Sequence, residues 1–178
     1  MDQKKVEFKT PWFEVESEEF PELKHLQGKP IYRINIFDSA VIVAFTDDQK
    51  LLLVRQFRPA SKQVTLELPG GVIDTGEAPE KAIIRELLEE TGYQCRELQF
   101  VGKGRCLPDR VNSDVFIFFG RGAKKVKDIS SQEDTEVIKV LLPELKKLLE
   151  EGKFTQLSVL GMILAVRWRL SPEELKGL

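Results

Sequence analysis

Cysteine and histidine are scarce in this chain, which limits the kinds of site it can build. Its 178 residues include 2 cysteines and 1 histidine. Cys95 and Cys106 are too few for the disulfide framework typical of small secreted domains, so we expect reduced thiols and a cytoplasmic protein. We expect His25 to lie on the surface and to take no part in the chemistry.

Long apolar runs, long basic runs, internal repeats and low-complexity tracts are also missing. No apolar stretch approaches the roughly 20 residues of a membrane span, and we expect no targeting signal in the charge-rich N-terminal stretch. The 27 Lys and Arg residues nearly balance the 29 Asp and Glu residues. We therefore expect neither a membrane nor nucleic acid as a partner. A hydrophobic content of 42% suits one domain with a full core.

What the chain does have is a helix signal between Gly71 and Tyr93. Pro79 suits the first position of a helix, because its missing N–H would be unpaired there, and Gly92 is the usual left-handed stop. We therefore expect a helix over residues 79–90. At about 100° per residue, the apolar side chains share one arc that faces a core, and the charged side chains share the opposite arc. The apolar set is Ile83, Ile84, Leu87 and Leu88, and the charged set is Arg85, Glu86, Glu89 and Glu90.

The acidic side chains of this helix are badly placed for a purely structural element. Glu89 and Glu90 occupy the last turn, where the helix dipole disfavours each negative charge by about 0.3–1 kcal/mol, and Glu86 lies one turn before Glu90. Two carboxylates about 5 Å apart repel by roughly 3 kcal/mol at an effective dielectric constant of 20. Mg²⁺ or Mn²⁺ would turn this repulsion into attraction, so the acidic patch indicates a metal site. The alternative interpretation is that the patch is an ordinary solvated helix face.

The same stretch resembles the Nudix box, G-x5-E-x7-R-E-U-x-E-E-x-G-U, in which U is a bulky apolar residue. Every specified position is matched, by Gly71, Glu77, Arg85, Glu86, Leu87, Glu89, Glu90, Gly92 and Tyr93. The resemblance implies a Nudix hydrolase, an enzyme that cleaves a nucleoside diphosphate linked to another group. It implies further site roles: metal binding by Glu86, Glu89 and Glu90, orientation of a glutamate by Arg85, capping of the loop–helix junction by Glu77, and a metal-facing backbone carbonyl at Gly70.

Around the helix, apolar alternation and β-branched runs predict mostly strands. We expect an N-terminal hairpin from residues 12–16 and 31–37, a central hairpin from 40–46 and 51–57, and strands over 64–68, 97–101, 114–119 and 135–142. A polar loop is expected over 104–113. Helices are expected over 144–150 and 157–170, the latter with Met162, Trp168 and its leucines in the core.

This pattern predicts an α/β (α+β) sandwich, which the resemblance narrows to the αβα Nudix sandwich. Residues 1–37 would form an N-terminal β extension, and residues 38–178 the Nudix hydrolase domain. In ADP-ribose-cleaving relatives such an extension exchanges with a second subunit. The resemblance therefore implies a homodimer in which residues 1–37 mediate dimerisation.

The resemblance leaves the general base open between several glutamates. In relatives acting on ADP-ribose, the base is a glutamate in the loop before a late strand, which corresponds to residues 130–136. Glu133 is the first candidate and Glu136 the second, and the alternative is that residues 131–134 form only an acidic surface loop. In other family members a box glutamate is the base, and Glu89 would then take this role.

Segments outside the box resemble the branch of the family that acts on ADP-ribose. Pro108 follows the box at the spacing found in that branch, and the segments that contain Arg58 and Glu67 also match it. We expect Arg58 to contact a phosphate or the second sugar, with a surface ion pair as the alternative, and assign Glu67 to substrate binding. Trp12 and Tyr32 are candidates to stack on the nucleobase, because an aromatic face attracts any base, and Trp12 could serve the pocket of a neighbouring subunit.

The predicted reaction is metal-dependent hydrolysis of ADP-ribose or a related nucleoside diphosphate sugar to a nucleoside monophosphate and a sugar phosphate. The loop over residues 107–113 lacks the Gly and Glu of the usual Pro-Gly-x-x-x-Glu form, so GDP-mannose and other sugars stay open. Arg110 in this loop could read phosphate or base, or could be a solvated arginine.

Two further functions stay as alternatives. One is hydrolysis of nucleoside triphosphates or dinucleoside polyphosphates, of which the second favours a tyrosine near Pro108, and no tyrosine follows Tyr93. The other is a nucleotide-sugar sensor without catalysis, but such domains usually lose the box glutamates, and all three are present here.

Overall fold

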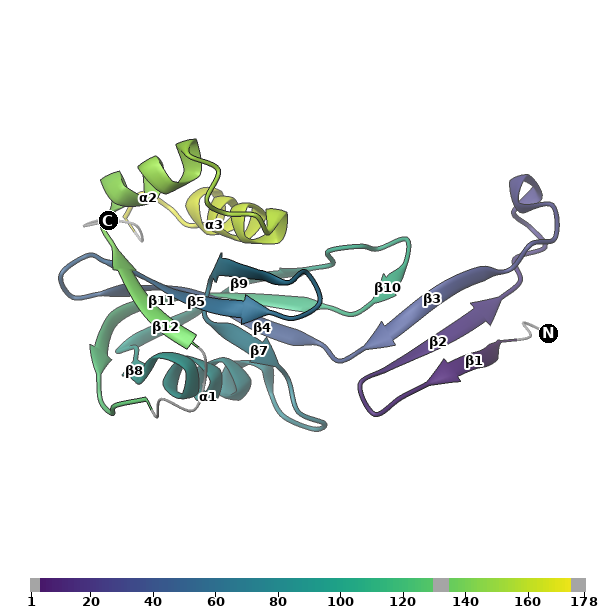
Figure 1. Cartoon of the computed structure of the whole chain (residues 1–178), viewed down its shortest axis with the longest axis horizontal. Helices are drawn as coiled ribbons and strands as arrows, with labels where there is room; N and C mark the ends of the chain where they lie inside the picture. Colours follow the sequence, from purple (N-terminus) through teal and green to yellow (C-terminus); the bar gives the residue numbers. More distant parts are fainter. Residues whose placement is uncertain (1–3, 130–134, 174–178) are drawn as a thin grey trace.

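The computed structural model describes residues 4–129 and 135–173. Its central strands carry one helix on one side and two helices on the other, and a ribbon of N-terminal strands projects from this body (Figure 1). The elements are β1 (Lys5–Lys9), β2 (Phe13–Glu18), η1 (Lys24–Leu26), β3 (Ile31–Ile36), β4 (Ser39–Thr46), β5 (Leu51–Arg58), β6 (Gln63–Glu67), β7 (Gly70–Val72), α1 (Pro79–Thr91), β8 (Tyr93–Gln94), β9 (Glu97–Gly104), β10 (Val111–Asn112), β11 (Val115–Lys125), β12 (Thr135–Val140), α2 (Leu142–Glu150) and α3 (Leu157–Arg169). The sandwich predicted from the sequence is confirmed.

The projecting ribbon is a sheet in the order β1-β2-β3-β10. We call β1, β2 and β3 the arm. The prediction of a two-stranded hairpin missed β1, and the predicted loop over residues 104–113 contains β10. β10 pairs in parallel with β3, where Val111 lies opposite Ile34. The arm is therefore held to the body by backbone pairing as well as by the chain that follows β3.

The central hairpin expected from β4 and β5 is open. These strands pair only where Phe45 meets Leu51, next to their turn, and then diverge. β4 continues in parallel with β11 and antiparallel with β7, whereas β5 pairs with β6 and β12. This divergence makes room for β7, which carries Gly70 and Gly71 into the body next to the box helix.

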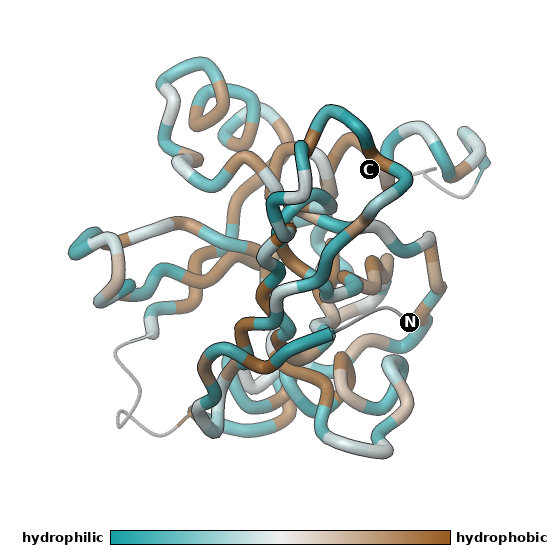
Figure 2. Tube along the Cα trace, turned by 90° about the vertical axis from the view of Figure 1, so that its right-hand side faces the viewer, coloured by the Kyte–Doolittle hydropathy of each residue, from teal (hydrophilic) through white to brown (hydrophobic). Residues whose placement is uncertain are grey.

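Alternate residues of β4 belong to two hydrophobic cores on opposite faces of the sheet. Val43 and Phe45 pack with the helices at the C-terminal end of the chain, and Ala40 and Ile42 pack under α1. This follows from the two-residue period of a strand. Figure 2 shows apolar stretches of the trace through the middle of the molecule.

The box helix begins at Pro79 as predicted and ends on Gly92, whose φ of 74° is left-handed. Its buried face, however, is turned from the expected arc. Ala82, Ile83, Leu87 and Thr91 are buried, whereas Ile84 is 43% exposed. The prediction that Ile84 faces the core is wrong, and so is the prediction that all four charged side chains lie opposite the core. Glu86 and Glu90 are half-buried between the apolar residues, because β7 lies under that part of the helix.

α3 also differs from expectation. Met162 is buried, as predicted, but Trp168 is 74% exposed and Leu157 is 78% exposed. The prediction that Trp168 and all the leucines of this helix lie in the core is therefore wrong. Cys95 and Cys106 are free, and His25 is exposed, both as expected. Within the described residues, no helix is long and apolar enough to cross a membrane.

Candidate active site

Gly70 and Gly71 bring the backbone of β7 against two acidic side chains of α1. The Gly70 N–H donates a hydrogen bond of 2.9 Å to Glu90 Oε2. A Cβ atom on Gly71 would lie 2.5 Å from Glu86 Cδ, and one on Gly70 would lie 2.3 Å from the Ala40 carbonyl oxygen. A side chain at Gly70 would strike the backbone of β4, whereas one at Gly71 would have to displace the Glu86 carboxylate. The close approach of strand and helix therefore fixes where both carboxylates lie.

Arg85 ties the loop before α1 to the acidic side of the helix. Its Nε and Nη2 donate to the two carboxylate oxygens of Glu77 at 3.2 and 2.9 Å, and Nη2 also donates to the Val72 carbonyl at 3.0 Å. Its Nη1 donates to Glu86 Oε1 at 2.7 Å and to Glu89 Oε2 at 3.2 Å. Hydrogen bonds from Arg85 hold the pKa of Glu77 below its usual value. One guanidinium thus sets the position of three carboxylates.

Burial disfavours the simultaneous ionisation of Glu86 and Glu90, the two carboxylates of α1 that lie against β7. Burial, with smaller contributions from Glu86 and Glu67, raises the pKa of Glu90 to about 7, against the hydrogen bond from Gly70 and the charge of Arg58. Burial also raises the pKa of Glu86. The surroundings of Glu86 and Glu90 therefore disfavour two negative charges here, and a cation would favour them.

A second ion pair lies next to this group, at the end of the β5–β6 hairpin. Arg58 Nε and Nη2 donate to the two carboxylate oxygens of Glu67 at 2.8 and 2.7 Å. Glu67 is 6% exposed and also accepts a hydrogen bond from Thr65. Burial opposes its ionisation, but Arg58 and Thr65 hold the pKa of Glu67 below its usual value. Arg58 is thus paired with a buried carboxylate, and its charge also acts on Glu90.

Of the two candidates for the general base near β12, Glu133 and Glu136, only Glu136 belongs to the described residues. Glu136 lies on β12, opposite Arg55 of β5, and the two side chains form an ion pair. Its side chain is 55% exposed. Glu133 lies outside the described residues. The choice among Glu133, Glu136 and Glu89 therefore stays a prediction.

The other predicted substrate residues lie on the arm and on the loop beside it. Trp12 is 75% exposed and Tyr32 is 53% exposed. Pro108 and Arg110 belong to the exposed loop between β9 and β10, and the Arg110 carbonyl accepts a hydrogen bond of 2.8 Å from the Ile34 N–H. Within residues 4–129 and 135–173, no hydrogen bond or ion pair joins these four residues to the carboxylates of α1.

Comparison with known proteins settles the family. Residues 36–159 match the NUDIX domain, which covers more than half of the chain. The chain belongs to the Nudix family. It is 30% identical over 115 residues to the ADP-ribose pyrophosphatase of Bacillus subtilis (strain 168), a match that covers 63% of this chain and 62% of the relative. It is 24% identical over 138 residues to the methanol dehydrogenase activator of Bacillus methanolicus, covering 78% and 75%.

Two further relatives have different kinds of match. A 44-residue stretch is 54% identical to the ADP-sugar pyrophosphatase of Mus musculus, but it covers only 25% of this chain and 20% of the relative. A crystal structure of an ADP compounds hydrolase superposes with a TM-score of 0.75 at 23% identity, covering 94% of this chain and 91% of that one. At this identity the structural match supports the Nudix fold alone.

The donor chemistry of this Nudix site suits a hard divalent cation. Glu86, Glu89 and Glu90 offer only carboxylate oxygens, and two of them are half-buried with raised pKa values. Over the described part of the chain, however, no three His, Cys, Asp or Glu side chains converge as a ready metal site. Arg85 holds Glu86 and Glu89, and the Gly70 N–H holds Glu90. Metal binding would therefore require these side chains to turn from their present partners.

Two contacts of the site were not found from the sequence. Thr65 donates to the buried Glu67, and the Val72 carbonyl accepts from Arg85. Thr65 and Glu67 are two residues apart on β6 and so share a face, which is a signal that could have identified Thr65. A backbone carbonyl such as that of Val72 leaves no mark in the sequence.

Proposed function

We propose that this Nudix protein hydrolyses the diphosphate linkage of ADP-ribose or a related nucleoside diphosphate sugar, giving a nucleoside monophosphate and a sugar phosphate. One observation carries the proposal: Glu86 and Glu90 are held half-buried against Gly71 and Gly70, where a cation would offset their charge. The names of the pyrophosphatase relatives from Bacillus subtilis and Mus musculus support the substrate class.

Glu86, Glu89 and Glu90, with the Gly70 carbonyl, would hold Mg²⁺ or Mn²⁺. When bound, the metal would neutralise diphosphate oxygens and lower the pKa of a bound water. Arg85 would position Glu86 and Glu89 through its hydrogen bonds of 2.7 and 3.2 Å.

Arg58 is a natural partner for substrate phosphate. Its guanidinium is fixed by two hydrogen bonds to the buried Glu67, yet 46% of its side chain is exposed. A fixed and accessible guanidinium suits the planar recognition of phosphate oxygens. Glu133, Glu136 or Glu89 would take the proton from the attacking water, and Trp12, Tyr32, Pro108 and Arg110 would contribute to recognition of the base and sugar.

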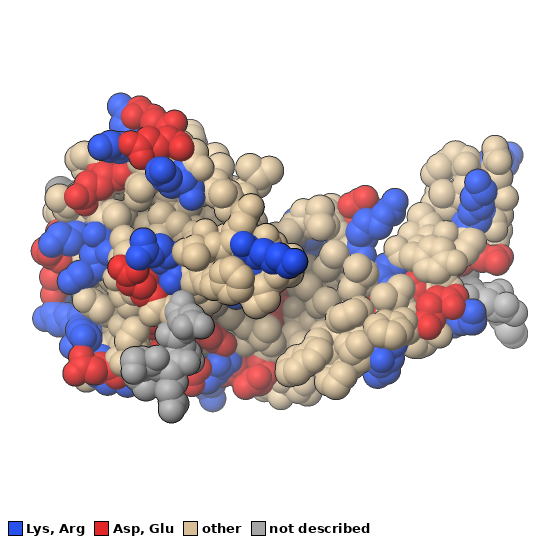
Figure 3. Space-filling model, in the orientation of Figure 1, with Lys and Arg blue, Asp and Glu red and all other residues tan. Residues whose placement is uncertain are grey.

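The arm supplies the argument for a homodimer. Phe8, Phe13, Tyr32, Ile34 and Ile36 share one face of its sheet, according to the cross-strand register. Tyr32 is 53% exposed and Ile36 is 44% exposed. Figure 3 shows uncharged surface along much of the arm. An apolar face of this kind is expected to be covered, and a second copy of the chain would cover it.

The test of the proposed function is a panel of substrates with product identification by mass. The purified protein is incubated with Mg²⁺ or Mn²⁺ and with ADP-ribose, GDP-mannose, UDP-glucose, ATP or diadenosine polyphosphates. Release of a nucleoside monophosphate and a sugar phosphate is the expected result. Cleavage of only ATP or the dinucleoside polyphosphates would overturn the assignment in favour of the alternative hydrolase. Metal binding without any cleavage would point to a nucleotide-sugar sensor.

A further inference from the structure

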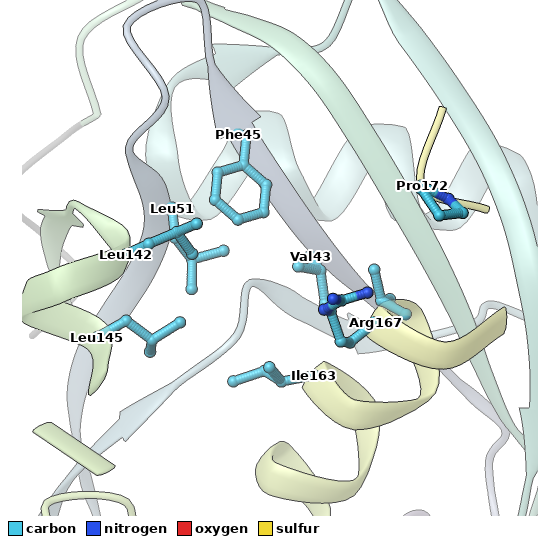
Figure 4. Close-up of a pocket in the computed structure, with 9 residues that line it drawn as sticks. Val43, Phe45, Leu51, Leu142, Leu145, Ile163, Arg167 and Pro172 are labelled. Carbon is cyan, nitrogen blue, oxygen red and sulfur yellow. The ribbon is translucent and has the colours of Figure 1, made fainter. Parts of the chain in front are cut away.

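A separate pocket lies on the other side of the sheet from α1, between the strands and the two C-terminal helices (Figure 4). Its volume is about 270 Å³. Phe45 and Leu51 form its floor and are 5% and 0% exposed. Leu145 of α2 and Ile163 of α3 line its walls. The pocket shares no residue with the acidic group on α1, so the proposed hydrolysis makes no use of it.

One charged side chain belongs to this pocket. Among the described residues that line it, Arg167 of α3 is the sole charged one, and Figure 4 shows the side chain reaching from the helix toward Val43 on the sheet. Arg167 makes no hydrogen bond or ion pair with any other described residue, although most arginines of the body do. The pocket therefore combines an apolar interior with an unpaired guanidinium at its rim.

We propose that this pocket binds a small monocarboxylic acid whose apolar tail enters the space between the helices and whose carboxylate pairs with Arg167. The charge of the rim selects an anion, and the apolar lining selects its tail. A cavity of about 150 Å³ accommodates benzene, so the present pocket accommodates an aromatic ring with a short chain, or an aliphatic chain of roughly six to eight carbons. A nucleotide is excluded, because the lining has too few polar groups and the volume lies below the usual range of about 300–1,000 Å³.

The proposal predicts a specific dependence of affinity on charge. In calorimetric titrations, wild-type protein should bind 3-phenylpropionate and octanoate with at least about tenfold higher affinity than the neutral 3-phenylpropan-1-ol, because a hydrogen bond to a charged group is worth roughly that factor. Arg167→Gln should remove this preference and leave the weak binding of the alcohol unchanged.

Two variants separate the pocket from general surface binding. Arg169→Gln is the matched control, since Arg169 lies on the same helix, does not line the pocket, and directs Nη1 to the Val101 carbonyl at 3.4 Å. It should keep wild-type affinity for the acids. Ile163→Phe fills the pocket and should abolish binding of acid and alcohol alike. If Ile163→Phe does not fold, as judged by circular dichroism, Leu142→Phe at the rim replaces it.

Several results would overturn the proposal. One is undetectable binding of both acids to the wild-type protein. Another is an equal loss of affinity for the acids in Arg167→Gln and Arg169→Gln. A third is undiminished binding of the acids by Ile163→Phe, in which the pocket is filled. None of these readouts depends on hydrolysis, so failure of the proposed function and failure of this site are distinguishable.

Discussion

At the scale of single residues, the Nudix site depends on two glycines as much as on its glutamates. Gly71 leaves the space that the Glu86 carboxylate fills, and Gly70 donates its N–H to Glu90. The backbone of these two glycines therefore positions the Glu86 and Glu90 side chains. Both kinds of residue can be tested with conservative substitutions.

Gly71→Ala should displace the Glu86 carboxylate without unfolding the protein. The new Cβ would lie 2.5 Å from Glu86 Cδ, and the end of a flexible side chain can move away. Because a displacement of about 1 Å can cost on the order of a hundredfold in rate, kcat/KM should fall by about this factor. Gly104→Ala is the control, since nothing lies within 4 Å of a Cβ there. Steady-state kinetics on the active substrate, with thermal melts of both variants, provide the measurement.

Glu90→Gln should weaken metal binding and catalysis together. It removes one carboxylate charge from the proposed ligand set, so we expect a loss of about 3 kcal/mol of transition-state stabilisation. The exposed Glu80 in the first turn of the same helix supplies the control, Glu80→Gln. Calorimetric titration with Mn²⁺ checks the binding independently of activity. Near-normal Mn²⁺ affinity and turnover in Glu90→Gln would remove this residue from the metal site.

At the scale of elements, the orientation of α1 distinguishes two adjacent isoleucines. Ile83 is 0% exposed under the sheet, whereas Ile84 is 43% exposed. Ile83→Ala should lower the free energy of unfolding by about 2–5 kcal/mol, because it leaves a cavity. Ile84→Ala should cost less than about 1 kcal/mol. Chemical denaturation of both variants measures the difference, and equal losses would contradict the orientation of the helix.

The arm depends on a buried acid in β2. Lys4 pairs with Glu16 at 2.6 Å and Arg33 Nε pairs with it at 3.1 Å, and Glu16 is 4% exposed. The hydrogen bond from Lys4, followed by those from Asn35 and Arg33, lowers the pKa of Glu16 to about 2 from 4.5. Since the pKa of Glu16 is lowered in the folded state, the ionised carboxylate stabilises the fold. This contribution to stability is complete above pH 4.5 and is lost as the pH falls toward 2.

The predicted pH dependence can be isolated with Glu16→Gln. Wild type should be more stable than this variant by about 1 kcal/mol at neutral pH, since the Lys4 side chain is 51% exposed and solvent screens its charge, and the difference should shrink between about pH 4.5 and pH 2. Trp12 at the β1–β2 turn reports on the arm once Trp168 is replaced by phenylalanine. A stability difference that is independent of pH over this range would show that Glu16 acts through packing alone.

At the scale of the whole molecule, two exposed apolar surfaces are candidates for the contact of the proposed homodimer. One is the face of the arm that carries Ile34, which is 37% exposed, and the other is the outer side of α3 with Leu157. We expect light scattering to give about twice the 20.4 kDa mass of the chain. Ile34→Lys should shift the protein toward monomer, whereas Leu157→Lys should not. The reverse result would assign the dimer contact to α3.

The division of the molecule into residues 1–37 and 38–178 stays a prediction, and the pairing of β10 with β3 shows why it is hard to draw. Val111 and Asn112 are far from the arm in the sequence, yet they extend its sheet. In Figure 1 the arm projects from the body, with β10 between them.

Local signals in the sequence were enough to determine the box helix and most strands. Pro79 and Gly92 set the ends of α1 through properties of their own backbones, namely a missing N–H and a left-handed φ. Continuous runs of apolar, β-branched and aromatic residues located β4, β5 and β11, which is again a local property of the sequence. The box residues could also be named from spacing alone, because α1 carries them in a single helix.

Only the tertiary structure decided which way those residues face and what they meet. The exposure of Ile84, the burial of Glu90 and the open β4–β5 hairpin all follow from the insertion of β7 beside β4 and under α1. β10 is two residues long and exists as a strand only because β3 is there to pair with it. Such contacts join segments that are distant in sequence, so neither residue type nor local period encodes them.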